Sequence, residues 1–204
     1  MLFALMLLAA QDGGSAVDAE RKMARAAQAE GQWTAVRRFA APDAIVLAPA
    51  PTPVADAYDR RDPPAAYRWS PAASYVACDG SAAVNTGPWT LGRRVGYFTT
   101  VWRRQSGGGW KWVLDSGDAL AAPRARPVKP RVRTASCAFQ RSANPHFATM
   151  AEPARPGHGK SDDGTLMWDW QAEAGGRYSL TVWLWNGRSL DKVVHDVLPT
   201  GEGD

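Results

Sequence analysis

The sequence predicts an α+β protein in which three N-terminal helices cover a curved, mainly antiparallel sheet. In the first third of the chain apolar residues recur at helical spacing, and from Tyr67 onward they alternate with polar residues. The turns between the alternating runs, such as Asp79-Gly80, are short enough to imply antiparallel connections. The chain has 204 residues, 45% hydrophobic and 22% charged, which is ordinary for a globular protein.

Capping and stop signals mark the helices. Ser15 and Asp18 form a capping-box pattern that begins a helix running to about Glu30, and Gly31 is the expected stop. On this helix the pattern assigns Ala19, Met23, Ala26 and Ala27 to one apolar face and Glu20, Arg21 and Arg25 elsewhere. The other expected elements are a short helix through Trp33, Val36 and Phe39, a strand over Ala44–Leu47, and a helix from Val54 to Arg61 ended by Pro63-Pro64.

Period-two alternation predicts the strands of the sheet. The four expected strands, joined as a meander, are Tyr67–Cys78, Ala82–Leu91, Arg94–Arg104 and Trp110–Asp115. Further alternating runs, beginning at Leu166, Tyr178 and Lys192, predict a C-terminal β-hairpin extension. Three strands alone are marginally stable in water, so we expect this extension to pack on the first domain or on a second subunit. The stretch from Pro145 to Gly164 is expected to be a long loop.

The N-terminus indicates an exported protein. An apolar run from Leu2 to Ala10 is too short to span a membrane, and it matches the core of a secretory signal, although no Lys or Arg precedes it. Residues 1–16 are therefore interpreted as a signal peptide, the alternative being a buried N-terminal helix. We expect a periplasmic or secreted protein without stable membrane insertion, or alternatively a cytoplasmic one. Export would permit a disulfide between Cys78 and Cys137, and two buried free thiols are the alternative.

The net charge of +4 is concentrated between Ala122 and Thr134, where five basic residues alternate with three prolines. This composition is typical of a semi-rigid, solvated linker. Nucleic-acid binding is not expected, because the stretch lacks aromatic residues for stacking and any recognisable binding fold. An anionic membrane surface is left open as a partner.

Several residues together resemble those of a known superfamily. They are Trp69 and Pro71, the Asp79-Gly80 turn, Thr86-Gly87 with Trp89, Tyr97, Val101-Trp102, and Trp110-Lys-Trp112 ending on Asp115. Over residues 17–120 the chain resembles the nuclear-transport-factor-2-like superfamily, and most of all its SnoaL-like branch, also known as domain of unknown function 4440. The resemblance implies a cone-shaped fold with an apolar cavity between the helices and the concave sheet. Ketosteroid isomerase, polyketide cyclases and many proteins of no known activity share that fold, so it does not select a function.

Composition and this resemblance together divide the chain into four parts. Residues 1–16 are the signal peptide and residues 17–121 the cone-shaped SnoaL-like domain. Residues 122–135 are the basic, Pro-rich linker, and residues 136–204 are the Trp-rich β extension. Nothing in the last part resembles a known family.

Catalysis of the isomerase kind in such a cone needs a carboxylate base and a tyrosine or protonated aspartate as hydrogen-bond donor. The candidates are Asp43, at the start of the first strand, Asp115, at the end of the last, and Tyr97, with Tyr58, Tyr67 and Tyr75 as further donors. Asp115 alternates with Trp110 and Trp112, so it should face away from them unless a β-bulge re-aims it. A polar strand end is the alternative role for this residue.

Aromatic and polar residues of the predicted strands are the candidate ligand contacts, with core packing as the alternative role of the aromatic ones. They are Trp69, Asn85, Thr86, Trp89, Tyr97 and Trp102. No metal site and no cofactor are expected, because His146, His158 and His195 are far apart and the chain has two cysteines.

Two functions of different class follow. In the first, the chain is an exported, non-catalytic protein that binds a small apolar ligand or serves as a homodimer module. In the second, it is an enzyme like a ketosteroid isomerase or polyketide cyclase, using a cavity carboxylate and a tyrosine. A cavity-facing carboxylate close to a tyrosine would favour the second.

Overall fold

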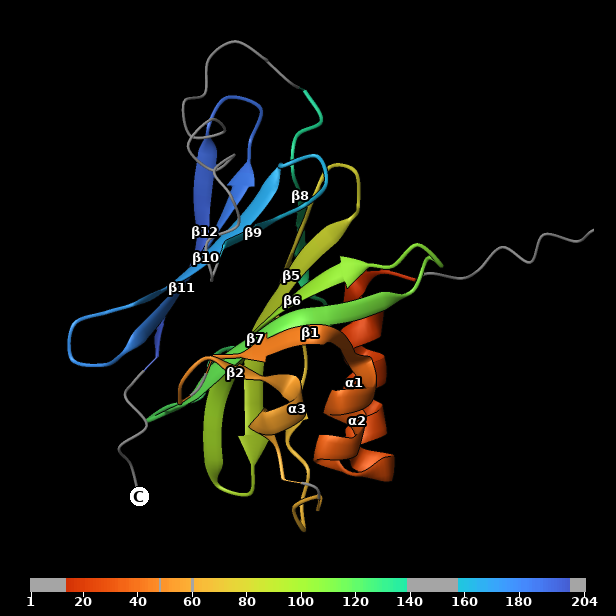
Figure 1. Cartoon of the computed structure of the whole chain (residues 1–204), viewed down its shortest axis with the longest axis vertical. Helices are drawn as coiled ribbons and strands as arrows, with labels where there is room; N and C mark the ends of the chain where they lie inside the picture. The colour runs from red at the N-terminus through yellow and green to blue at the C-terminus, as the bar shows by residue number, and fades with distance from the viewer. Residues whose placement is uncertain (1–13, 48, 60, 139–157, 199–204) are drawn as a thin grey trace, which may run out of the picture.

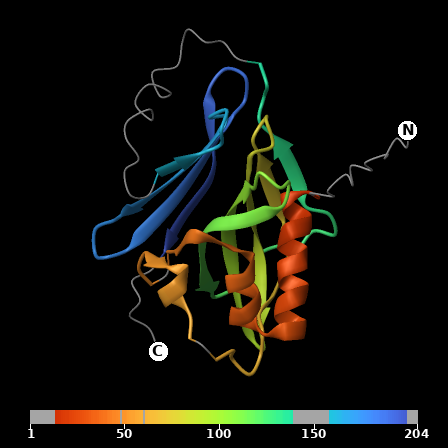
Figure 2. The same cartoon turned by 45° about the vertical axis from the view of Figure 1, so that its right-hand side comes forward.

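The structure is a computed structural model that describes residues 14–47, 49–59, 61–138 and 158–198. It has three layers, with two helices on one face of an eight-stranded sheet and a four-stranded sheet on the other face (Figures 1 and 2). The predicted α+β class and the curved sheet are confirmed. Residues 1–13, which carry most of the expected signal peptide, and His146 lie outside the described residues.

The first sheet has the strand order β2-β1-β7-β6-β5-β4-β8, and β3 pairs with β5 off this path. Its strands are β1 (Ala40–Val46), β2 (Thr52–Pro53), β3 (Arg68–Trp69), β4 (Ala73–Val76), β5 (Ala82–Leu91), β6 (Arg94–Arg104), β7 (Trp110–Leu120) and β8 (Arg131–Thr134). The second sheet has the order β12-β11-β10-β9, formed by β9 (His158–Lys160), β10 (Leu166–Ala172), β11 (Tyr178–Trp185) and β12 (Leu190–Leu198). The helices are α1 (Ala16–Glu30), α2 (Gln32–Phe39) and α3 (Val54–Ala57).

The first two helices begin and end where the sequence predicts. At α1 the side chain of Ser15 accepts a hydrogen bond from the Asp18 N–H, and the Asp18 carboxylate accepts one from the Ser15 N–H. Gly31 ends the helix with φ +115°, a conformation that favours glycine. The carboxylate of Asp62 accepts hydrogen bonds from the N–H groups of Trp33 and Thr34 and so caps α2 from outside the helix.

Four segments differ from the prediction. Helix α3 ends at Ala57 instead of Arg61. The strand expected over Tyr67–Cys78 is split into β3 and β4 around Pro71, which has no N–H to donate to a neighbouring strand. Part of the expected linker forms β8, which pairs in parallel with β4 and satisfies that edge strand. The expected loop before Gly164 contains β9 at the edge of the second sheet.

A β-bulge in β7 decides which face its residues occupy. Opposite β6, Trp102 pairs with Trp112 but Val101 pairs with Leu114, so Val113 is an extra residue in β7. Each further residue of the strand therefore points to the opposite face from the one that strict alternation predicts. The strand also continues to Leu120, so Asp115 lies inside β7 and not at its end.

Separate cores lie on the two faces of the first sheet. Met23 and Val36 from the helices pack against Phe98, Trp102 and Trp112 on the inner face. The outer face packs on the second sheet, and that core contains Val84, Val101, Leu114, Trp168, Leu180 and Val182. The C-terminal extension therefore packs on the first domain of its own chain, and a homodimer would have to use another surface.

A disulfide fastens the ends of β4 and β8 in the first sheet, and polar contacts join the two sheets. A disulfide links Cys78, just after β4, to Cys137, with a Cα–Cα distance of 5.2 Å, so the two cysteines are not free thiols. The carboxylate of Asp163 accepts from the Asp79 N–H at 3.0 Å, and the carboxylate of Asp79 accepts from the Asp163 N–H at 2.9 Å. These reciprocal bonds fix the turn after β9 against the turn after β4.

Candidate functional site

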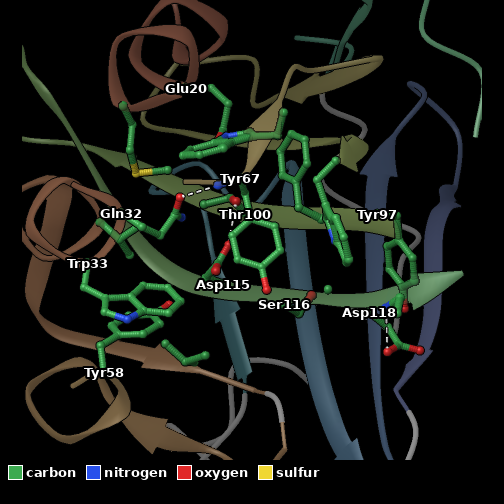
Figure 3. Close-up of a pocket in the computed structure, with 18 of the residues that line it drawn as sticks. Glu20, Gln32, Trp33, Tyr58, Tyr67, Tyr97, Thr100, Asp115, Ser116 and Asp118 are labelled. Carbon is green, nitrogen blue, oxygen red and sulfur yellow. Dashed lines mark hydrogen bonds between the residues drawn. The ribbon is translucent and has the colours of Figure 1, made fainter. Parts of the chain in front are cut away.

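A cavity of about 320 Å³ lies between the helices and the inner face of the first sheet (Figure 3). Most of its wall is aromatic or apolar, with a few polar groups, as is common in small-molecule sites. The apolar side is formed by Met23, Trp33, Val36, Val46, Tyr58, Tyr67, Trp69, Trp89 and Phe98. The polar side includes Glu20, Gln32, Arg94, Thr100, Asp115, Ser116 and Asp118.

The bulge at Val113 turns Asp115 into this cavity. Regular alternation predicts that Asp115 faces away from Trp112, and the extra residue reverses that orientation. On the neighbouring strand the Thr100 hydroxyl donates a hydrogen bond to Asp115 Oδ1 at 2.8 Å. The carboxylate therefore has one fixed oxygen and one oxygen without a partner among the described residues.

Asp115 is a basic carboxylate that remains accessible. Burial raises its pKa to about 6, and the hydrogen bond from Thr100 opposes this shift only in part. The residue is surrounded by protein, but its side chain keeps a partly exposed surface toward the cavity. A ligand in the cavity can thus reach a carboxylate that is mostly ionised at neutral pH.

Glu20, on α1, is a second carboxylate of the site and is fully buried. The indole N–H groups of Trp69 and Trp102 donate to its two oxygens, each at 2.7 Å, and the Asn85 amide donates to Oε2 at 3.3 Å. Burial raises its pKa to about 7, the indole donors lower it, and the nearby charge of Asp115 raises it. Because these three donors enclose the carboxylate, Glu20 is far less accessible than Asp115.

Tyr58 and Tyr67 line the same cavity as Asp115 (Figure 3). Tyr58 stacks on Trp33 with ring centroids 4.5 Å apart. Burial is the main cause that raises the pKa of Tyr58 well above its usual value, and the charge of Asp115 adds to it. Tyr67 is held by its backbone, since its N–H donates to Gln32 and its carbonyl accepts from Gln28. Tyr58 therefore stays protonated at neutral pH and is available as a hydrogen-bond donor.

Of the predicted ligand contacts, Trp69, Trp89 and Tyr97 line the cavity. The ring of Tyr97, however, belongs to the core with the second sheet and lies under Arg124, whose guanidinium carbon is 3.8 Å from the ring centroid. Figure 3 places it beside Asp118, away from Tyr58. Tyr97 and Tyr58 therefore belong to different parts of the cavity wall.

The other predicted contacts have different roles. Trp102 and Asn85 hold Glu20 and do not line the cavity. The Thr86 hydroxyl donates to the Phe98 carbonyl at 2.8 Å, so it is used within the sheet. Asp43 is exposed on β1 and is not part of the wall, which removes it as a catalytic candidate.

Sequence reasoning missed Glu20 because the helical pattern set it apart from the apolar face. In the structure the buried residues of α1 include Ala16, Glu20, Met23 and Ala27, which are spaced by three or four positions and form one stripe. A carboxylate in the middle of such a stripe was the available signal, since acidic residues are seldom fully buried without partners.

The described ranges contain no cluster of three or more His, Cys, Asp or Glu side chains able to hold a metal ion. In the same ranges no helix has the length and hydropathy needed to cross a membrane. Fold and site together define an α+β protein with an aromatic cavity that contains one accessible and one enclosed carboxylate.

No protein-family model and no curated protein matches the sequence. Among solved structures, a candidate ketosteroid isomerase from Kribbella flavida DSM 17836 is similar, with 16% sequence identity. The alignment covers 58% of this chain and 93% of that chain, with a TM-score of 0.33. With so low a TM-score the likeness carries no argument, and membership of the SnoaL-like branch stays a prediction.

Proposed function

We propose that the protein binds a compact, largely apolar carbonyl compound and that Asp115 acts on it as a general base. One observation carries this proposal: an accessible carboxylate faces an aromatic cavity, and burial raises its pKa to about 6. Such a group is mostly ionised at neutral pH, yet it is a stronger base than an ordinary aspartate. The cavity volume of about 320 Å³ is at the lower end of the range for ligand sites, which favours a compact molecule.

The proposed step is removal of a proton from the carbon beside the carbonyl group. The oxygen of Asp115 that has no hydrogen bond from Thr100 takes the proton, while a hydroxyl of Tyr58 or Tyr67 donates to the developing enolate oxygen. Asp115 then returns the proton to the same carbon or to a conjugated one. The second outcome is an isomerisation, and neither outcome needs a co-reactant.

Proton exchange with solvent tests this step directly. We would incubate 2-tetralone, a compact ketone with acidic CH₂ groups, in D₂O and follow loss of its α-protons by NMR. The wild type should accelerate exchange, with a rate that rises through about pH 6. Asp115→Asn should lower the enzymatic rate roughly 10²–10⁴-fold.

Asp43→Asn is the matched control, because Asp43 is an exposed aspartate of the same sheet that lies outside the cavity. Exchange that is equally fast in wild type and Asp115→Asn would refute the role of Asp115. A wild type that binds 2-tetralone without accelerating exchange would refute the catalytic step and favour a second candidate function, ligand binding alone.

That second candidate is ligand binding without catalysis. It is favoured by one observation: within the described residues no hydrogen bond joins the hydroxyl of Tyr58 or Tyr67 to Asp115 or to another group. A tyrosine donor that is not already fixed in place contributes less to a transition state. In that case saturable binding would be unaffected by pH around 6 and would occur without exchange.

We further propose that the protein is exported, which the disulfide between Cys78 and Cys137 supports, since such bonds persist in oxidising compartments. Mass spectrometry of the mature chain from cells would test removal of residues 1–16 and the state of the thiols together. Homodimer formation is a separate proposal, and light scattering of the purified chain would decide it.

A further inference from the structure

Arg94 is a cation on the wall of the cavity that no other described residue neutralises. It lies at the start of β6, its side chain is exposed, and it belongs to the cavity lining. An exposed residue that also lines a cavity stands at the opening. Among the described residues it has no ion pair, hydrogen bond or aromatic ring as partner.

One face of β6 forms a row from the opening to the inner end of the cavity. Arg94, Gly96, Phe98 and Thr100 alternate along the strand, and Thr100 contacts Asp115. At Gly96 a Cβ atom would lie 2.2 Å from the ring of Trp89, so that ring rests directly on the backbone between Arg94 and Phe98. From the opening inward, the cavity wall therefore presents a cationic side chain, then a flat aromatic surface, and then a carboxylate.

The length of this row leaves room for a compact ring system with a short side arm. Arg94 and Thr100 are six residues apart, which spans ~20 Å in a strand at ~3.3 Å per residue. The arginine side chain and the Asp115 side chain cover part of that span. What remains is long enough for a ring system lying against Trp89 and Phe98.

We infer that the ligand of this cavity is a carboxylate or similar anion on an apolar cyclic body, bound with its anionic group at Arg94. This orientation follows from the charges, because the inner end holds Asp115 and Glu20, and a buried anion beside them would be repelled and poorly solvated. Asp118 also lines the cavity, but among the described residues it forms no ion pair with Arg94, and its Oδ1 accepts a hydrogen bond from the Ala119 N–H. This ligand class goes further than the proposed function and rests on it only for the role of Asp115 as the base at the inner end of the cavity.

Calorimetric titration with two matched probes tests the charge preference. The probes are 2-naphthylacetate and its neutral analogue 2-naphthylacetamide, which have the same ring system. The wild type should bind the acetate about fivefold more tightly, as for a partly exposed ion pair worth up to ~1 kcal/mol. The preference should decline with added salt, because Arg94 is exposed.

Arg94→Gln should abolish the preference, and circular dichroism would verify its fold. Arg93→Gln is the matched control, since Arg93 is the exposed neighbour in the turn and does not line the cavity. Equal binding of both probes by the wild type, or an equal loss in the two arginine variants, would overturn the inference. So would failure of the acetate to bind.

Asp115→Asn separates this inference from the proposed function. The variant should keep the preference for the acetate while it loses proton exchange on 2-tetralone. If Asp115→Asn still exchanges the protons of 2-tetralone as fast as the wild type and also keeps the charge preference, Asp115 is not the base, but the anion site at Arg94 stands. If Asp115→Asn strengthens acetate binding more than Arg94→Gln weakens it, the carboxylate binds at the inner end and the orientation is wrong.

Discussion

The buried carboxylate of Glu20 should make the protein less stable as pH rises, and Glu20→Gln should remove this effect. In the folded chain the pKa of Glu20 is about 7, against an ordinary value of 4.5. The folded state therefore binds the proton more tightly than the unfolded state does. Stability must fall as pH rises from about 4.5 to about 7, because ionisation is easier after unfolding. A difference of that size corresponds to about 3 kcal/mol.

Two other carboxylates of raised pKa, Asp115 beside Glu20 and Asp196 on β12, act in the same direction. The pKa of Asp115 rises to about 6 from 3.8, and burial also raises the pKa of Asp196. Because Asp115 and Glu20 interact, their contributions do not add, and the wild type should lose several kcal/mol in total between pH 5 and pH 8. Asp18 and Asp62, whose pKa values are lowered, affect stability only at more acidic pH.

Glutamine at position 20 cannot ionise, so the variant lacks this part of the pH dependence. Its amide N–H₂ must face one of the indole or amide donors that now contact Glu20, and an unsatisfied buried donor costs about 1–3 kcal/mol. At pH 5 the variant should thus be less stable than the wild type. Toward pH 8 it should gain about 3 kcal/mol relative to the wild type.

Urea denaturation followed by tryptophan fluorescence at pH 5, 6, 7 and 8 measures this difference. Asp43→Asn serves as the control, because it removes an exposed carboxylate and should leave the wild-type pH profile unchanged. A wild type with the same unfolding free energy at pH 5 and pH 8 would refute the reasoning. A Glu20→Gln profile parallel to the wild type would refute it equally.

Two further changes test the packing around the cavity and the disulfide that fastens the ends of β4 and β8. Gly96→Ala should destabilise the fold by about 1–3 kcal/mol and displace Trp89 and the β7 backbone, since the new Cβ would lie 2.2 Å from both the Trp89 ring and the Asp118 carbonyl oxygen. Gly109→Ala has open space around it and should cost little, and urea denaturation with probe binding compares the two variants. Replacing Cys78 and Cys137 together by serine should cost up to about 4 kcal/mol for a loop with 59 residues of separation, and reductant should destabilise the wild type but not this double variant in the same assay.

Local signals were sufficient to predict most elements of the first domain. The capping box at Ser15 and the positive φ of Gly31 determine where α1 begins and ends, and each residue is directly adjacent to one end of the helix. Gly80, with φ +68°, closes the tight turn before β5, and the alternation in β5 and β6 depends only on which residues face each core. These features act over a few residues and are therefore visible in the sequence.

The site depends on contacts that no short stretch specifies. Glu20 meets Trp69 and Trp102, which are 49 and 82 residues away, so the pattern of α1 alone gives a charged residue without its donors. The strand β8 was missed for the same reason, since its pairing with β4 joins segments far apart in the sequence. Proline-rich composition predicted a linker there, and the unpaired edge of β4 overrode that preference.

The bulge in β7 connects the two cores with the chemistry of the cavity. Before Val113 the strand sends Trp110 and Trp112 toward the helices, and after it Leu114 packs with the second sheet while Asp115 enters the cavity. Without the extra residue Leu114 would face the cavity, and the Asp115 carboxylate would be buried against the apolar second sheet. That arrangement would desolvate an ion without a partner, so the second sheet favours the bulge on energetic grounds. The C-terminal extension thus contributes to the site although none of its described residues lines the cavity, because the apolar core that it forms on the outer face favours the register that turns Asp115 inward.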